Sequence, residues 1–491
     1  MNLEPISRRR MLGLAAVGAV AVAGGAAGWA AGVGVPRSRL RLGPAAQPLA
    51  EPEVLTGRDG VLDVELTAAA GVALAGRDTF ASGFNGSSPG PTLRVRPGEL
   101  LRVRLVNQLD QPTNLHTHGL HVSPERNGDN PFVVVDPGAS FDYAYRIPAT
   151  HPAGTFWYHP HHHGYVADQI FAGLAGALLV DDGPDLPVGR ERVLLITDTT
   201  LGSSGQVITA SPMERMMGRE GELVLVNGQH QAMLTARPGA SERWRIINGC
   251  VSRVLSLRLA GHRPTQVAAD GYFLPAPVDR DRVVLSPGNR ADVVIHPAAA
   301  GDYPLITDPH PRGTPGMGGM GRMDTASAGR GPVTLATLRV TGSPQRPARL
   351  PVTLPAPLAP AGPVVRQRAL TFAMGMRGMG MGGMTFTIDG RSFDPHRVDQ
   401  TVRLGSTEEW VLSNTSPLEH SFHLHVWPFQ VIGGSAGTPP QGTLQDVVVV
   451  PARGWVRLRI RFADYPGRSV YHCHTLDHED AGMMATIQVD R

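Results

Sequence analysis

Apolar and polar residues alternate over short segments along most of the chain. Clear examples are "TLRVRPGELLRVRLVNQL" from Thr92, "ARPGASERWRIINGC" from Ala236 and "VRLGSTEEWVLSN" from Val402. Alternation with a period of two residues, broken by turns that contain Gly, Pro or Ser, is typical of paired strands and not of helices. The pattern therefore predicts an all-β protein.

The three segments occupy equivalent places in a longer repeat. Each contains a strand that ends in Asn, and these strands precede "NLHTHGL", "RVLSLRLAG" and "EHSFHLHV" respectively. The ends of the first and third copies also correspond, because "TFWYHPHHHG" matches "RSVYHCHTLD" with Pro160 in the place of Cys473. Three copies predict three related β domains. We place them at about residues 52–184, 190–343 and 365–491, with a Pro-rich linker over residues 344–364.

The N-terminal residues 1–35 have the features of a targeting segment. Arg8, Arg9 and Arg10 precede an apolar run rich in Gly and Ala that extends to about Val35. This arrangement resembles a twin-arginine export signal and predicts a periplasmic or extracellular protein that is exported in the folded state. The alternative is an uncleaved N-terminal membrane anchor, since the run is long enough to span a bilayer.

Charge and cysteine content exclude two classes of protein. The formal net charge is +3 over 491 residues, and the basic residues outside the N-terminal triplet are scattered, so no nucleic-acid site is expected. Cys250 and Cys473 are the only cysteines, which excludes a disulfide framework. A single bridge between these two cysteines remains open.

Histidines concentrate in four short motifs, two in the first repeat and two in the third. The motifs hold ten of the 19 histidines: His116 and His118, His159 and His161, His420, His423 and His425, and His472, His474 and His478. In a strand, an H-x-H pair directs both imidazoles to one face, and the residue between them faces the opposite side. Four such motifs predict metal binding.

The same alternation predicts two separate metal sites around one strand. Cys473 faces away from its neighbours, and a Cys with two His and a weak thioether ligand is the pattern of a blue-copper electron-transfer site. The residues that supply this set are His420, Cys473, His478 and Met483. The other eight histidines exceed what one metal needs. They predict a histidine-only metal cluster between the first and third domains.

Taken in order, the four motifs resemble those of the multicopper oxidases, and "HCHTLDHEDAGMM" is similar to the corresponding stretch of bacterial copper-efflux oxidases and laccases. The resemblance implies three consecutive cupredoxin-like Greek-key β-sandwich domains that bind four copper ions. It also implies that single electrons from a reducing donor are used to reduce O2 to water. Phenols, aromatic amines and reduced metal ions such as Cu(I) are the expected donors.

The resemblance also implies a role for each motif residue. Type 1 copper would be held by His420, Cys473, His478 and Met483, and type 2 copper by His116 and His423. The type 3 pair would be held by His118, His159, His161, His425, His472 and His474. Glu479 resembles the family's proton-relay acid. Asp129 is a second candidate, although the family carries its Asp nearer the position of Asn127.

Two Gly- and Met-rich segments bear on the electron donor. They contain Met317, Met320 and Met323, and Met374, Met376, Met379, Met381 and Met384. Thioethers prefer Cu(I), which favours a copper role, and the alternative is a pair of flexible loops. Ser416 and Leu418 stand where copper-efflux oxidases carry an Asp and a Met that seat Cu(I), which weakens the assignment to a cuprous oxidase.

Other functions remain as alternatives. A periplasmic copper-binding or tolerance protein would use the Met-rich loops to sequester copper. A copper nitrite reductase should lack the four H-x-H pairs, and structural zinc sites are closed sets of four ligands. The middle domain has no ligand cluster in its sequence, so its expected role is to pack between its neighbours. His162 and His163 are expected to face solvent or to support the ligands.

Overall fold

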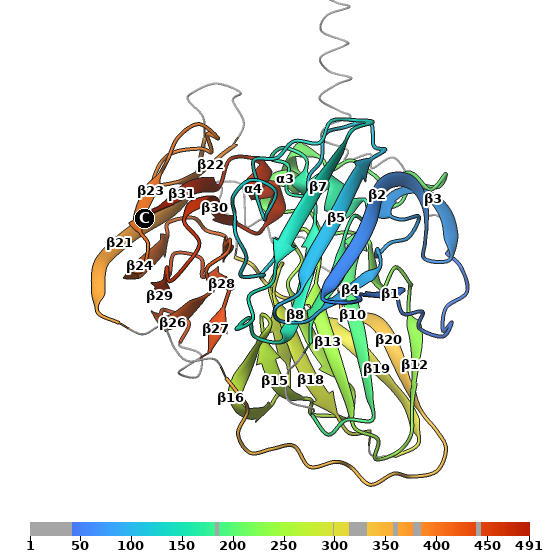
Figure 1. Cartoon of the computed structure of the whole chain (residues 1–491). Coiled ribbons are helices and arrows are strands. Elements are labelled where there is room, and N and C mark those ends of the chain that lie inside the picture. The colour runs from blue at the N-terminus through green and yellow to red at the C-terminus, as the bar shows by residue number, and fades with distance from the viewer. Residues whose placement is uncertain are drawn as a thin grey trace, which may run out of the picture.

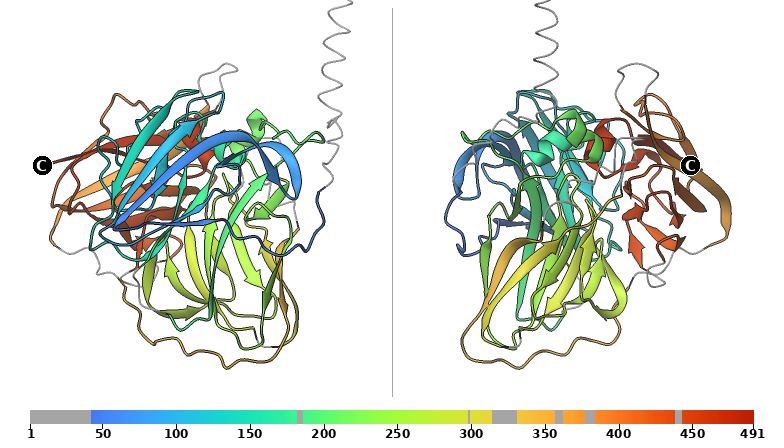
Figure 2. Two further views of the ribbon diagram at one scale, coloured as in Figure 1. Left: turned by 45° about the vertical axis from the view of Figure 1, so that its right-hand side comes forward. Right: turned by 180° about the vertical axis from the view of Figure 1, so that it is seen from behind.

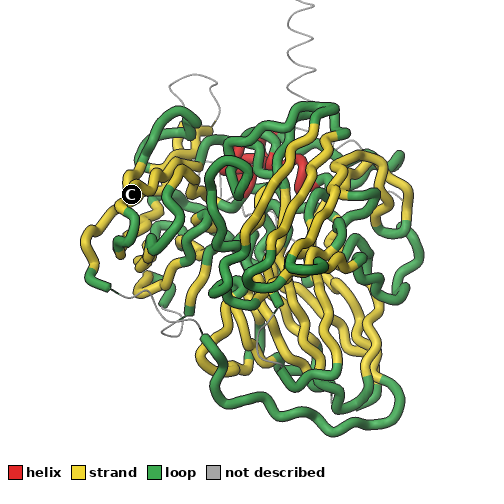
Figure 3. Tube along the Cα trace, in the orientation of Figure 1, coloured by secondary structure: helices red, strands yellow, loops and turns green. Residues whose placement is uncertain are grey.

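The computed structural model describes residues 42–181, 186–297, 299–313, 331–356, 362–376, 384–437 and 443–491. Strands dominate this part of the chain, and the few helices are short (Figure 3). Within the described residues, none of the helices has the length and apolar character needed to span a membrane. The all-β prediction is confirmed. The export segment predicted over residues 1–35 lies outside the described residues.

The first two sheets form a sandwich near the N-terminus. A five-stranded sheet has the order β1-β4-β9-β8-β6, and a four-stranded sheet has the order β3-β2-β5-β7. Burial alternates along β2, where Leu62, Val64 and Leu66 face the core while Asp63 and Glu65 face solvent. The strands are β1 (Val54–Thr56), β2 (Val61–Leu74), β3 (Arg77–Phe84), β4 (Thr92–Val95), β5 (Leu100–Asn107), β6 (His116–His118), β7 (Ser140–Arg146), β8 (Gly154–His159) and β9 (Gly176–Val180).

The middle sandwich packs a six-stranded sheet, β11-β10-β13-β18-β15-β16, against a five-stranded sheet, β12-β20-β19-β14-β17. Its core contains Trp244, Leu257 and Leu338. The strands are β10 (Arg190–Thr199), β11 (Leu223–Val226), β12 (Ala232–Ala236), β13 (Glu242–Asn248), β14 (Leu255–Leu259), β15 (Thr265–Ala269), β16 (Tyr272–Asp279), β17 (Val283–Leu285), β18 (Arg290–Ile295), β19 (Gly301–Asp308) and β20 (Val333–Val340).

The third sandwich repeats this plan with the sheets β22-β21-β24-β29-β26-β27 and β23-β31-β30-β25-β28. Cys473 and Met483 belong to its apolar core. The strands are β21 (Val364–Met376), β22 (Met384–Ile388), β23 (Gln400–Arg403), β24 (Thr407–Asn414), β25 (His420–Leu424), β26 (Phe429–Gly434), β27 (Leu444–Gln445), β28 (Val447–Val450), β29 (Trp455–Arg461), β30 (Gly467–Cys473) and β31 (Met484–Asp490).

A buried asparagine marks the same position in each sandwich. Asn107, Asn248 and Asn414 end β5, β13 and β24, and each accepts a hydrogen bond from the main-chain N–H two residues later. Each side-chain amide also donates to main-chain carbonyl groups of nearby loops. Buried polar groups are stable only when they are paired in this way. The repeat seen in the sequence is therefore a repeat of one buried hydrogen-bond network.

The three sandwiches are arranged so that each contacts the other two (Figure 1). The middle sandwich, drawn in green and yellow, lies below the blue and red sandwiches in this view. Three short helices, α2 (Val166–Phe171), α3 (Pro212–Met217) and α4 (Leu476–Asp480), come from the three different sandwiches. They lie together where the sandwiches meet (Figure 2).

The linker before the third sandwich runs along the middle sandwich. Its described residues 344–356 and 362–363 contain no helix or strand. Gln345 donates to the carbonyl group of Pro238, and Leu354 donates to that of Pro275. Leu354 also packs against a small apolar cluster of the middle sandwich. The linker is therefore extended, and it is also anchored.

Candidate metal centres

Strand pairing brings the histidine motifs together in two pairs. In the first sandwich, β6 pairs antiparallel with β8 and places His116 opposite His159. In the third sandwich, β25 pairs antiparallel with β30 and places His423 opposite His472. The two strand pairs meet at the interface, where the rings of His118 and His423 stack with centroids 3.8 Å apart. One buried region therefore collects all four H-x-H pairs.

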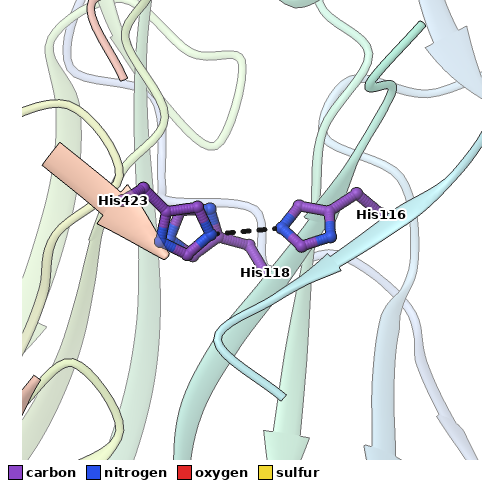
Figure 4. A group of neighbouring side chains, drawn as sticks. All are labelled: His116, His118 and His423. Atoms are coloured by element: carbon purple, nitrogen blue, oxygen red, sulfur yellow. Dashed lines mark hydrogen bonds between the residues drawn. The ribbon is translucent and has the colours of Figure 1, made fainter. Parts of the chain in front are cut away.

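The first group in this region joins His116 to His423 across the interface (Figure 4). Nδ1 of His116 lies 2.9 Å from the carboxylate of Asp129, and Nδ1 of His423 lies 2.8 Å from the main-chain oxygen of Asp446. A neutral imidazole carries one N–H, so these oxygens hold the proton on Nδ1 and leave a lone pair on Nε2. The two Nε2 atoms face one another at 3.4 Å.

The second group contains His118, His159 and His474. Nε2 of His118 lies 3.1 Å from Oδ1 of Asp446, and Nδ1 of His159 lies 2.8 Å from the carbonyl oxygen of Pro160. These acceptors again place the proton on the outer nitrogen. The remaining nitrogens, Nδ1 of His118 and Nε2 of His159, are 3.4 Å apart.

The third group contains His161, His425 and His472. Nδ1 of His472 lies 3.2 Å from the carbonyl oxygen of Cys473. Its Nε2 lies 3.1 Å from Nε2 of His161 and 3.2 Å from Nε2 of His425. The three Nε2 atoms therefore converge on one point between the first and third sandwiches.

The sulfur-containing group lies on the other side of β30. Sγ of Cys473 is 3.4 Å from Nδ1 of His420 and 4.0 Å from Nδ1 of His478, and the two Nδ1 atoms are 3.3 Å apart. The outer nitrogens contact oxygens, Oγ of Ser416 at 2.8 Å and the carbonyl oxygen of Met216 at 3.1 Å. Met483 is fully buried in the same core, and its carbonyl oxygen accepts from the N–H of Cys473.

Burial keeps these ligand groups ready for a metal ion. It lowers the pKa of all ten motif histidines, to about 3 for His159, His161 and His420, so the imidazoles are neutral. It also raises the pKa of the Cys473 thiol to about 12. A thiolate forms in such a site when a metal cation takes the place of the proton.

Lone pairs that face one another at 3.3–3.4 Å repel unless a cation lies between them. A metal ion in each group removes this repulsion, and imidazole and thiolate are ligands that suit copper. The donor sets therefore fit metal ions. Cys250 and Cys473 are both free and buried, so the open alternative of a disulfide between them is wrong.

Comparison with known proteins identifies the family. Sequence models described as multicopper oxidase match residues 68–185, 191–343 and 364–491. The chain belongs to the multicopper oxidase family. Copper is the metal that this membership implies, and the proposed resemblance is confirmed, as is the fold of three cupredoxin-like β-sandwiches.

Individual relatives align with most of this chain. The chain is 27% identical to multicopper oxidase mco of Staphylococcus aureus, over 83% of this chain and 84% of the relative. It is 29% identical to cell division protein FtsP of Sodalis glossinidius, over 83% and 85% of the two chains. The solved structure of a multicopper oxidase from Campylobacter jejuni, titled a metallo-oxidase, superposes with a TM-score of 0.80 at 28% identity and covers 93% of this chain and 98% of its own.

Two carboxylates predicted to relay protons lie beside the histidine groups of this oxidase. Oε2 of Glu479 is 2.9 Å from Nδ1 of His472, and its Oε1 is 3.4 Å from Nε2 of His161. Asp129 contacts His116, and its Oδ1 accepts from the N–H of Thr117 at 2.8 Å. Burial raises the pKa of both carboxyl groups to about 7.

The structure places Asp129, and not Asn127, against the histidines. Asn127 is exposed, and its side-chain amide donates to the carbonyl oxygen of Asp142. A third buried carboxylate, Asp446, contacts His118 and was not predicted from the sequence. Its segment, "LQDVVVV", carries no histidine and no local metal motif, so only the folded chain shows its place.

The extra histidines lie outside the four groups. His162 is half-buried and stacks on Tyr165, while the ring of His163 packs against Phe393. Neither residue belongs to a group of converging ligand atoms among the described residues. The prediction that they are not ligands stays a prediction.

Ser416 orients a histidine of the sulfur-containing group. Its hydroxyl contacts Nε2 of His420, and Leu418 beside it is buried in the core. Losing a hydrogen bond to the outer nitrogen of a metal ligand typically costs about 10–100-fold in metal affinity. We therefore expect Ser416→Ala to lower copper affinity at this group by that order while the histidine-only groups stay loaded. Copper titration followed by the copper–thiolate absorption measures the loss, and Ser435→Ala, an exposed site in the same sandwich, is the control.

Proposed function

We propose that this chain takes single electrons from a reducing donor at the sulfur-containing group and uses them to reduce O2 to water at the histidine-only groups. The observation that carries the proposal is that Cys473 belongs to the first site while its chain neighbours His472 and His474 belong to the second. The single strand β30 therefore connects the two sites. Family membership alone would not establish this activity, since a relative of similar identity is named a cell division protein.

We propose that the chain binds four copper ions. We assign type 1 copper to His420, Cys473, His478 and Met483, and type 2 copper to His116 and His423. We assign one ion of the type 3 pair to His118, His159 and His474, and the other to His161, His425 and His472. The type 2 assignment is supported by the facing Nε2 atoms of His116 and His423, and the other three by converging nitrogen or sulfur atoms. The place of Met483 rests on its packing beside Cys473.

Bound copper would supply the redox chemistry, which is one-electron oxidation of the donor and four-electron reduction of O2. The protein supplies the path for electrons between the two sites, since one peptide unit links Cys473 to each neighbouring histidine. It also supplies protons. Glu479 lies within 3.4 Å of two cluster histidines, and a carboxyl group with a pKa of about 7 can hold a proton on Oε1 or Oε2 and release it near neutral pH. We propose Asp129 as a second relay group for the same reason.

A surface groove of about 480 Å³ lies next to the sulfur-containing group. Its walls include Met213, Met216, Met384, Phe386 and Asp480. The ring of Phe386 stacks on His478 with centroids 4.4 Å apart, and the carbonyl oxygen of Met216 accepts from Nε2 of the same histidine. We propose that the electron donor binds in this groove, because its wall directly contacts a type 1 ligand.

The groove supports two classes of donor. An aromatic ring suits phenols or aromatic amines, and three thioethers suit Cu(I). Met384 belongs to the second Met-rich segment, of which Met379 and Met381 lie outside the described residues, as do Met317, Met320 and Met323. Ser416 is buried, and its hydroxyl group contacts Asn414, Leu418 and His420, so it is not exposed to a substrate ion in the groove.

We also propose, from residues 1–35, that the protein is exported to the periplasm or beyond.

The thioethers in the groove also support the alternative of a copper-binding or tolerance protein. Oxygen uptake per bound copper separates the two functions. An oxidase consumes O2 continuously when a phenol or Cu(I) is supplied, so we expect many turnovers per bound copper. O2 uptake that stops after one equivalent of O2 per bound copper would contradict the proposed oxidase activity and support a copper-buffering protein.

A further inference from the structure

The middle sandwich contributes no group of converging ligand atoms among the described residues, yet two of its arginines reach the metal-binding regions of the third sandwich. Arg219 follows α3 and contacts α4, and Arg290 begins β18 and contacts the segment between β27 and β28. Both arginines are almost fully buried. Their contacts lie on opposite sides of β30, one near each proposed copper site.

Arg219 holds the helical turn that carries His478. Its Nε donates to Oδ1 of Asp477 at 2.9 Å, its Nη2 donates to the same oxygen at 2.6 Å, and its main-chain N–H donates to Oδ2 at 2.8 Å. Asp477 directly precedes His478 in α4. Nη1 of Arg219 also reaches Asp168 of α2 at 2.5 Å. One guanidinium group therefore fixes α4 against both other sandwiches.

Arg290 holds the carboxylate that contacts the histidine-only groups. Its Nη1 and Nη2 donate to the two carboxylate oxygens of Asp446 at 2.7 and 2.5 Å. Asp446 in turn accepts from His118 through Oδ1 and from His423 through its main-chain oxygen. The arginine is itself anchored, since its main-chain N–H donates to Asp270 at 2.9 Å and its side-chain Nε donates to the carbonyl oxygen of Thr155 at 3.1 Å.

The backbone beside Arg290 also touches the ligands. Gly288 has a φ of +88°, and a Cβ atom there would lie 3.0 Å from Cε1 of His118 and 3.1 Å from ring carbons of His474. Its carbonyl oxygen accepts from Nη1 of Arg290. The middle sandwich thus packs directly against two cluster histidines at a position where only glycine fits without strain.

Arginine suits this role because its planar guanidinium group stays charged and can donate two hydrogen bonds to one carboxylate. The orientation of a metal-binding histidine depends on the oxygen that its outer nitrogen contacts, so a fixed Asp446 means a fixed His118. Without the guanidinium group, a buried carboxylate would lose its counter-charge and move or become protonated.

We propose that two arginines of the middle domain position the copper sites: Arg219 orients the type 1 ligand His478 through Asp477, and Arg290 orients the histidine cluster through Asp446. This inference rests on the proposed copper assignments. It assigns the middle domain a role beyond the packing expected from its sequence. Both arginines are positioning residues, since neither touches a reacting atom.

The test uses Arg219→Lys and Arg290→Lys in the copper-loaded full chain. Lysine keeps the positive charge but cannot form the bidentate hydrogen bond to the carboxylate. Arg192→Lys is the matched control, because Arg192 is another buried arginine of the middle domain, is paired with Glu242 of the same domain, and contacts neither tested arginine nor any of the four groups. The readouts are the copper–thiolate absorption and type 1 EPR signal for one site, and the type 2 EPR signal and copper content for the other.

We expect a crossed result, with copper affinity lowered about 10–100-fold at the type 1 site alone in Arg219→Lys and at the cluster alone in Arg290→Lys. Equal losses at both sites, or no loss at either, overturn the inference. If a lysine variant does not accumulate, Asp168→Asn removes the acceptor of Nη1 of Arg219, and Asp270→Asn removes the acceptor of the main-chain N–H of Arg290. These variants must show the same crossed pattern, more weakly. A wild-type protein without either copper signal would contradict the proposed function, which separates the two failures.

Discussion

Cys473→Ser is expected to abolish donor-driven oxygen uptake and leave the histidine cluster loaded. The hydroxyl group is a harder and weaker ligand than a thiolate, so the type 1 ion loses its defining donor and the connection to His472 and His474 carries no electrons. All eight cluster histidines keep their geometry. We therefore expect oxygen uptake at the level of copper-free protein, no copper–thiolate absorption, and a retained type 2 EPR signal.

Cys250→Ser is the matched control for this experiment. Cys250 is equally buried, but its sulfur contacts the carbonyl oxygen of Ile196 in the middle sandwich and no histidine group. This variant should keep both the absorption and the oxygen uptake. Uptake by Cys473→Ser that equals the wild-type rate would show that electrons reach the cluster without the sulfur.

Copper loading is expected to stabilise the protein strongly against unfolding. Without metal, lone pairs of buried imidazoles face one another at 3.3–3.4 Å, and a bound ion replaces this repulsion with attraction. A ligand that binds only the folded state at about 1,000 times its Kd adds about 4 kcal/mol for one site. Thermal unfolding of copper-free and copper-loaded protein should therefore differ by many degrees.

A ligand variant makes this prediction specific. His423→Ala removes one of two facing lone pairs, so it should reduce the stability gained from copper far more than it reduces the stability of the copper-free protein. His262→Ala changes a histidine outside the four groups and should keep the full gain. A copper-induced gain of the same size in both variants would contradict the proposed role of His423.

Local patterning predicted the strands and the opposite directions of Cys473 and its neighbours, because alternation is set by backbone geometry. The prediction that both histidines of each H-x-H pair lie on one strand was only partly correct. Only His116 and His118 both lie within one strand, β6, while β8 ends at His159 and β30 ends at Cys473. The second histidine of each such pair lies just past the strand, where turn geometry and contacts across the interface orient the ring.

The sequence predicted the histidine cluster between the first and third sandwiches, but it did not predict the contacts that the middle sandwich makes with this cluster. Asp446 and Arg290 are separated by more than 150 residues, and each occurs in an ordinary strand-like segment. Nothing in "PGNRADVV" or "LQDVVVV" indicates that the two meet beside a metal site. The repeated buried asparagines, in contrast, depend on a local loop in each sandwich, which is why the repeat was visible in the sequence.

The central claim is that facing lone pairs form four separate copper-binding groups in one folded chain. The most direct test is the copper content of the fully loaded protein, measured by elemental analysis after removal of loosely bound metal. The claim predicts four copper ions per chain, one for each of the four assigned ligand sets. A smaller number at saturation, or zinc retained in preference to copper, would contradict it.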